Sequence, residues 1–211
     1  MGGRAVRVTG GTARGVPLRS PTAPGVRPTT DRVRAALFSI LTGYGIEDAI
    51  VADLYAGTGS LGIEALSRGA AHADFVEADR RQVEVIRANL TTTKLAANAR
   101  VHAAKVEDAL PRLAASESRR YDFLLMDPPY TKPFPADVVE RIGALGLLAE
   151  EGIAVVGHAS RVQAPEACGR MVRTQDRRYG DASLAFYEVR QDVPSLNERA
   201  REDDQGTEAG E

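Results

Sequence analysis

The chain has 211 residues, 43% of them hydrophobic, which is enough for one main domain with a small appendage. Its single cysteine, Cys168, excludes an internal disulfide, and one cysteine with three scattered histidines does not build a zinc site. The sequence shows no charged segment leading into an apolar one and no apolar run of about 18 residues. We therefore expect a cytoplasmic protein with no metal and no membrane segment.

The formal net charge of -2 hides an uneven distribution. Residues 1–41 hold seven arginines and one acidic residue, whereas residues 192–211 hold seven acidic residues and two arginines. The acidic end is rich in small and polar residues and is predicted to be disordered. The sequence thus divides into a basic extension (1–41), a main domain (42–190) and an acidic tail (191–211).

Short apolar runs alternate with helical patterns along the main domain, which indicates a mostly parallel sheet with helices on both faces. The expected helices cover residues 30 or 31 to 41, 60–68, 80–94, 107–113 and 136–148. The expected strands cover residues 50–55, 73–77, 100–103, 121–126 and 153–157. Two further strands, 169–174 and 182–189, have no long helix between them, so a terminal antiparallel hairpin is predicted.

The run Asp127-Pro128-Pro129-Tyr130 directly follows the apolar strand 121–126. Proline has no N–H and a fixed backbone, so the strand ends there and leaves carbonyl oxygens beside an acid and an aromatic ring. The Asp127 carboxylate and the Pro128 carbonyl can accept hydrogen bonds from the amino group of a nucleobase, while Tyr130 stacks on the base. The pattern predicts a site that activates a planar amine.

A glycine loop with the sequence Asp53-Leu54-Tyr55-Ala56-Gly57-Thr58-Gly59-Ser60-Leu61-Gly62 follows the first strand. Its glycines allow a sharp turn and close approach of a ligand to the start of the next helix. The loop also fits the nucleotide-binding pattern of dehydrogenases, with Glu77 in the position of their ribose-binding acid. However, Asp53 would repel a pyrophosphate and suits a ligand that carries an ammonium group, such as S-adenosylmethionine.

These two motifs, in this order and spacing, resemble class I S-adenosylmethionine-dependent methyltransferases. The segment Arg27-Pro28-Thr29-Thr30-Asp31-Arg32-Val33-Arg34, with Gly10-Gly11 and Arg14-Gly15 before it, narrows the resemblance to the bacterial family that methylates N2 of a guanine in 16S ribosomal RNA. The resemblance covers about residues 4–190. It implies a Rossmann-like sheet with a C-terminal antiparallel hairpin, S-adenosylmethionine as cofactor, and a monomer that acts on the small ribosomal subunit.

The resemblance also implies a role for each motif residue. Asp127, Pro128, Pro129 and Tyr130 would form the catalytic site. The cofactor would be bound by Asp53, Tyr55, Gly57, Thr58, Gly59, Gly62, Glu77, Glu107, Asp108, Thr29 and Thr30. Of these, Thr29 and Thr30, together with Arg27, would lie either near the cofactor or against the RNA backbone. Within this set, Glu77 would bind the ribose hydroxyls, and Asp108, or Glu107 in its place, the adenine edge. RNA would be bound by Arg4, Arg7, Arg14, Arg19, Arg27, Arg32 and Lys132, although a basic segment can also be no more than a solvated surface.

Two other functions fit part of the pattern. DNA adenine-N6 methyltransferases also carry Asp-Pro-Pro-Tyr, but they usually add a domain that reads a duplex, and this chain has only its basic extension to spare. A compact enzyme fits a base that is already exposed in folded RNA. A non-catalytic RNA-binding module on the same fold would be expected to have lost one of the two motifs, and both are intact here.

Overall fold

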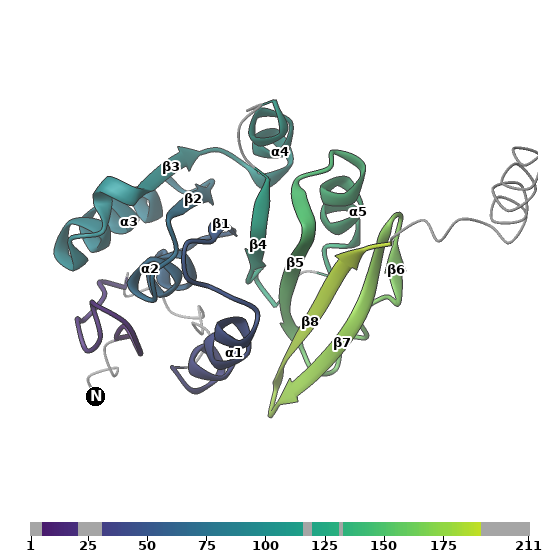
Figure 1. The fold of residues 1–211 in the computed structure, drawn as a ribbon, viewed down its shortest axis with the longest axis horizontal. Coiled ribbons are helices and arrows are strands. Elements are labelled where there is room, and N and C mark those ends of the chain that lie inside the picture. Colours follow the sequence, from purple (N-terminus) through teal and green to yellow (C-terminus); the bar gives the residue numbers. More distant parts are fainter. Residues whose placement is uncertain (1–5, 21–30, 116–119, 131–132, 191–211) are drawn as a thin grey trace, which may run out of the picture.

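The computed structural model describes residues 6–20, 31–115, 120–130 and 133–190 (Figure 1). Its centre is an eight-stranded sheet with the order β3-β2-β1-β4-β5-β8-β7-β6. The strands are β1 (Ile50–Leu54), β2 (His72–Glu77), β3 (Ala99–Ala103), β4 (Tyr121–Met126), β5 (Leu148–Ala159), β6 (Ala167–Cys168), β7 (Met171–Tyr179) and β8 (Ala182–Val189). Strands β1 to β5 are parallel, and β8 and β7 form the predicted antiparallel hairpin beside β5. The short strand β6, which was not predicted, pairs with β7 in antiparallel fashion.

Helices cover both faces of this sheet (Figure 1). They are α1 (Asp31–Gly43), α2 (Ser60–Ser67), α3 (Arg80–Thr93), α4 (Val106–Ala114) and α5 (Ala136–Ala144), with a short 3-10 helix at Ala96–Asn98. Alternate strand residues point to opposite faces. Leu125 of β4 therefore packs in the hydrophobic cluster with α1, α2 and α3, and Met126 packs in the cluster with α4 and α5.

The prediction was wrong around α5 and in the last strands. The helix expected over 136–148 ends at Ala144, because Gly146 takes a positive φ of 60° and Leu148 already pairs with Tyr121 of β4. Strand β7 continues to Tyr179, past the expected end at 174. Its last residues are mostly charged and exposed, so their pairing with β8 leaves no apolar signal in the sequence.

The described part of the basic extension forms a small hairpin that packs on the main domain. Val8 exchanges backbone hydrogen bonds with Val16 and Gly15, and Arg7 pairs with Pro17. Val6, Val8 and Leu18 are buried in the same hydrophobic cluster as α1 and α2. The close packing explains Gly11, since a Cβ there would lie 1.7 Å from the carbonyl oxygen of Ser67.

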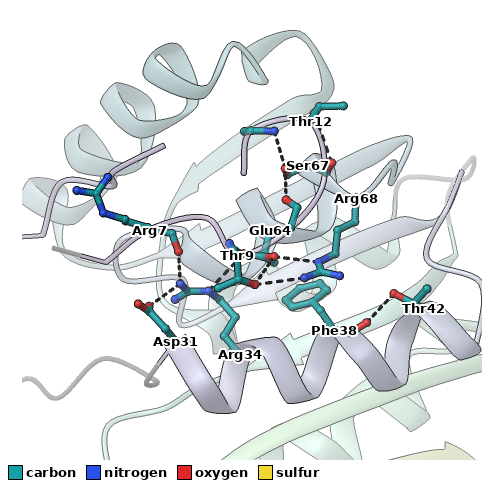
Figure 2. Close-up of polar contacts among 12 residues, drawn as sticks. Arg7, Thr9, Thr12, Asp31, Arg34, Phe38, Thr42, Glu64, Ser67 and Arg68 are labelled. Carbon is teal, nitrogen blue, oxygen red and sulfur yellow. Dashed lines mark hydrogen bonds and ion pairs between the residues drawn. The ribbon is translucent and has the colours of Figure 1, made fainter. Parts of the chain in front are cut away.

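A buried carboxylate, that of Glu64 on α2, connects the hairpin with α1 (Figure 2). It accepts hydrogen bonds of 2.7 Å from both the backbone N–H and the hydroxyl of Thr9, and one of 2.9 Å from Nε of Arg68. The guanidinium of Arg34 on α1, also fully buried, lies 3.4 Å from it. Arg34 in turn donates to Asp31 and to the backbone carbonyl of Arg7. Charges removed from water require such partners.

We predict that Glu64→Ala lowers the free energy of unfolding by about 3–5 kcal/mol, because the buried Arg34 guanidinium then keeps only the partly exposed carboxylate of Asp31 as a charged partner. Urea denaturation measures the loss. The double variant Glu64→Leu with Arg34→Met should recover part of it, since neither charge remains. Glu84→Ala is the control, because it removes the carboxylate of an exposed ion pair with Arg87. A loss in Glu64→Ala no larger than that in Glu84→Ala would contradict the role of Glu64.

Candidate active site

The carboxyl ends of β1, β2 and β4 meet at one edge of the sheet, because these strands are parallel neighbours. This edge brings together Asp53, Glu77 and Asp127, which lie far apart in the sequence. Burial raises the pKa of Asp53 well above its ordinary value, and the charges of Asp127 and Glu77 raise it further. The structure thus places the acids of the two predicted motifs, Asp53 and Asp127, together with Glu77 in one electrostatic environment.

Two of these carboxylates hold the glycine loop in shape. The Asp53 carboxylate, 1% exposed, accepts a 2.9 Å hydrogen bond from the Gly62 N–H at the start of α2. The Glu77 carboxylate accepts 2.8 Å hydrogen bonds from the N–H groups of Gly57 and Asp79. Gly57 takes a positive φ of 55°, and a Cβ there would meet open space except for one backbone oxygen at 4.0 Å. The loop is therefore preformed and open on one side.

The close packing of the loop on the sheet depends on Gly62. A Cβ at this position would lie 2.4 Å from the ring of Phe75 on β2, so α2 could not approach the strand as it does. Gly59, with a φ of 76°, precedes α2 and packs against the same ring. The two glycines thus fix the start of the helix beside the carboxylates.

Tyr55 and Glu107 come together on the other side of the loop. Burial raises the pKa of Tyr55 to about 12, and the charge of Glu107 and its hydrogen bond with the Tyr55 hydroxyl act in the same direction. Glu107 and Asp108 both lie exposed in the first turn of α4. Of the two candidates for the adenine edge, Glu107 is the one that contacts the loop residue Tyr55.

The Asp127-Pro128-Pro129-Tyr130 run leaves the same edge at the end of β4. Burial raises the pKa of Tyr130, as do the charge of Asp127 and the hydrogen bond that the Tyr130 hydroxyl donates to it. Gly157 of β5 makes room for the carboxylate, because a Cβ there would lie 2.7 Å from Oδ1 of Asp127. A small hollow beside Asp127 is lined by apolar residues that include Leu37 of α1 and Leu184 of β8.

The structure places only some of the remaining predicted residues. Arg7, Arg14, Arg19 and Arg32 are exposed. The predictions for Arg4, Arg27, Thr29, Thr30 and Lys132 concern positions outside the described residues.

Sequence reasoning missed Asn89, a buried residue of α3 that connects the basic hairpin with the glycine loop. Its side chain accepts from the N–H of Arg19 at 2.8 Å, and it donates to the carbonyl oxygens of Arg19 and Thr58. A polar residue between Ile86 and Leu90 on the apolar face of this helix was the available signal.

Within the described residues, no helix is long and apolar enough to span a membrane. The same residues contain no group of three or more histidine, cysteine, aspartate or glutamate side chains arranged to bind a metal ion.

The strand order and the helices on both faces define a Rossmann-like fold. The sequence profile of the family described as "Conserved hypothetical protein 95" matches residues 6–188. Similar proteins include ribosomal RNA small subunit methyltransferase D of Escherichia coli K12, with 39% identity over 72% of this chain and 73% of that protein. Another is "Putative rRNA methyltransferase YlbH" of Bacillus subtilis, with 34% identity over 88% of this chain and all of that protein.

Among solved structures, the hypothetical protein TTHA0928 of Thermus thermophilus is similar, with a TM-score of 0.76, 34% identity, and coverage of 88% of this chain and 100% of that one. Since the family profile and the relatives cover most of the sequence, the chain belongs to the family of ribosomal RNA small subunit methyltransferase D.

We predict that Asp53→Asn keeps the fold, whereas Asp53→Ala lowers the free energy of unfolding by about 1–3 kcal/mol because the Gly62 N–H loses its acceptor. A carboxyl with a raised pKa stabilises the fold most below its unfolded pKa, near 3.8, and loses that contribution as pH rises through the folded pKa. Asparagine does not titrate. The stability of Asp53→Asn relative to the unchanged protein should therefore rise with pH.

Urea denaturation at several pH values between about 4 and 8 measures this difference. Parallel stability curves for the unchanged protein and Asp53→Asn would contradict the burial of an ionisable Asp53.

Proposed function

We propose that this protein transfers a methyl group from S-adenosylmethionine to the exocyclic N2 of a guanine in 16S ribosomal RNA of the small subunit. The observation that carries the proposal is the convergence of Asp53, Glu77 and Asp127 beside the open glycine loop. The name of the Escherichia coli relative supports the small-subunit RNA as substrate. Within this proposal, the resemblance points to the enzyme type that acts on guanine 966.

The residues at the edge fit this cofactor better than a dinucleotide. The carboxylate of Glu77, with Asp53 beside it, opposes a pyrophosphate and favours a ligand with an ammonium and a sulfonium group. When bound, S-adenosylmethionine supplies an electrophilic methyl group. Glu77, at the end of β2, would hold the ribose, and an ammonium group bound near Asp53 would favour the ionised form of its carboxyl. These charges argue against a nicotinamide-dependent dehydrogenase.

The residues after β4 would activate the amine. An exocyclic amine is a weak nucleophile, because its lone pair is delocalised into the base. Hydrogen bonds to the Asp127 carboxylate and the Pro128 carbonyl would hold its two hydrogens and favour attack by nitrogen. The Tyr130 hydroxyl orients the Asp127 carboxylate through a hydrogen bond, and the missing side chain at Gly157 leaves room for it. The proton released by the amine would pass to Asp127 or to water.

We predict different losses in two variants at this edge. Glu77→Ala should weaken S-adenosylmethionine binding by about 1.5–3 kcal/mol, since hydrogen bonds to a charged group are lost. Asp127→Ala should bind the cofactor almost normally and lose most turnover, because its partner arrives only with the RNA. Titration calorimetry measures the first effect, and single-turnover methyl transfer to RNA measures the second.

Glu140→Ala, which removes an exposed carboxylate on α5, is the control and should change neither quantity. Normal turnover in Asp127→Ala would remove the proposed amine site. Normal cofactor affinity in Glu77→Ala would remove the ribose contact.

We also predict that the exposed arginines of the basic hairpin bind RNA phosphates. Arg7→Gln, Arg14→Gln and Arg19→Gln together should keep cofactor affinity and weaken RNA binding. Each lost phosphate contact should reduce the slope of log affinity against log salt by about 0.7–0.9, because fewer counterions are released. Filter binding at several salt concentrations measures the slope.

The matched control replaces three exposed arginines elsewhere, Arg87, Arg100 and Arg112, by glutamine. Equal RNA affinity and salt slope in the two triple variants would show that the hairpin arginines are only a solvated surface.

A further inference from the structure

The hairpin formed by β7 and β8 extends beyond the edge that carries the candidate active site. Strand β4 ends at Met126, which pairs with Val156 of β5, but β5 continues to Ala159. Ala159 pairs with Ala182, which also pairs with Tyr179 at the end of β7. The tip of the hairpin therefore lies beyond the same edge of the sheet at which β4 ends, and it lies near α1 in Figure 1.

Register places one arginine of this hairpin in line with Asp127. Gly157 pairs with Leu184, and Leu184 pairs with Arg177. Asp127 follows Met126, the partner of Val156, and its carboxylate lies over Gly157, where a Cβ would be only 2.7 Å from Oδ1. These four residues thus form one row across β4, β5, β8 and β7. With about 4.8 Å between neighbouring strands, the backbones of Asp127 and Arg177 are about 14 Å apart.

Arg177 lies on the same face of the sheet as the hollow beside Asp127. Residues directly opposite in neighbouring strands point to the same face. Leu184, the partner of Arg177, lines that hollow together with Leu37 of α1. The exposed side chain of Arg177 is therefore on the α1 side, at the level of the candidate active site.

An exposed aromatic ring is held beside this arginine. Nε of Arg177 donates a 2.8 Å hydrogen bond to the side-chain oxygen of Gln175. The side-chain nitrogen of Gln175 donates a 3.0 Å hydrogen bond to the hydroxyl of Tyr44, which follows α1. Tyr44 is 47% exposed, an unusual position for a large side chain in this protein. The chain of two hydrogen bonds orients the ring and leaves it open to a ligand.

The charges around the tip favour an anionic partner. Arg161 and Arg178 are exposed near the turn, where Ser160 bonds to the backbone of Gly180. Asp181 is an exposed acidic residue of the same turn, so the tip carries charges of both signs, with more arginines than acidic residues. A fixed aromatic ring combined with arginines is the surface that single-stranded nucleic acids bind, through base stacking and phosphate contacts.

We propose that Tyr44 and Arg177, connected by Gln175, bind the RNA strand that flanks the target nucleotide. The ring of Tyr44 stacks on a neighbouring base, and the guanidinium of Arg177 binds a phosphate. The inference rests on the proposed function, because it takes RNA as the substrate. It adds a second contact surface to the basic hairpin of the extension, which packs on the helices at the other end of the sheet in Figure 1.

Two variants test the surface, Tyr44→Ala and Arg177→Gln. Both should bind S-adenosylmethionine and melt as the unchanged protein does. Tyr44→Ala should weaken RNA binding by about 5- to 150-fold, the range for losing one stacked base. Arg177→Gln should weaken RNA binding and reduce the salt slope by about 0.7, the value for one phosphate of a single strand. Filter binding with RNA of the small subunit measures both.

Two matched controls separate the contact from general effects. Tyr44→Phe loses the hydrogen bond to Gln175 but keeps the ring, so it should retain most RNA affinity. Arg190→Gln removes the same charge at the far end of the hairpin, where Val189 pairs with Met171, and should leave affinity and salt slope unchanged.

The outcomes distinguish this inference from the proposed function. If the unchanged protein binds and methylates RNA while Tyr44→Ala and Arg177→Gln bind as tightly as Arg190→Gln, only the inference is overturned. If the unchanged protein neither binds nor methylates RNA, the proposed function is overturned, and the inference with it.

Discussion

The ion pair between the buried carboxylate of Glu64 and the buried guanidinium of Arg34 is the interaction on which the rest of the structure depends. A charge removed from water is stable only with partners, and those of Glu64 come from the hairpin, α1 and α2. Helix α2 also starts at the glycine loop, where Asp53 holds Gly62. The hairpin proposed to bind RNA and the loop proposed to bind the cofactor are therefore connected through α2.

The order of the strands explains how two separate motifs can serve one reaction. The chain adds β2 and β3 on one side of β1 and then β4 and β5 on its other side. In sheets of this kind, ligands bind outside the carboxyl ends of the strands at the point where the order changes, here between β1 and β4. The loop after β1 and Glu77, the last residue of β2, lie on one side of this point, and Asp127 lies on the other. In the proposed function, a methyl donor bound by the loop and Glu77 would thus meet an acceptor amine bound by Asp127.

The sequence predicted most of the fold because its signals are local. Apolar runs bounded by glycine or proline located β4 and β8 to the residue, and the two motifs located the edge of the site. Contacts formed only in the folded chain were missed. In the sequence, Glu64 and Arg34 look like ordinary exposed charges on helices. Nothing around Gly157 indicates that the Asp127 carboxylate packs against it. The exposed end of β7 was missed for the same reason.

The most direct test of the proposed function is the identity of the nucleoside that receives the methyl group. Small ribosomal subunits or their RNA, incubated with the protein and labelled S-adenosylmethionine, can be digested and separated into nucleosides. Methyl transfer to guanine N2 predicts label in N2-methylguanosine from the 16S RNA. Label in N6-methyladenosine, or no transfer to RNA by a folded protein that binds the cofactor, would contradict it.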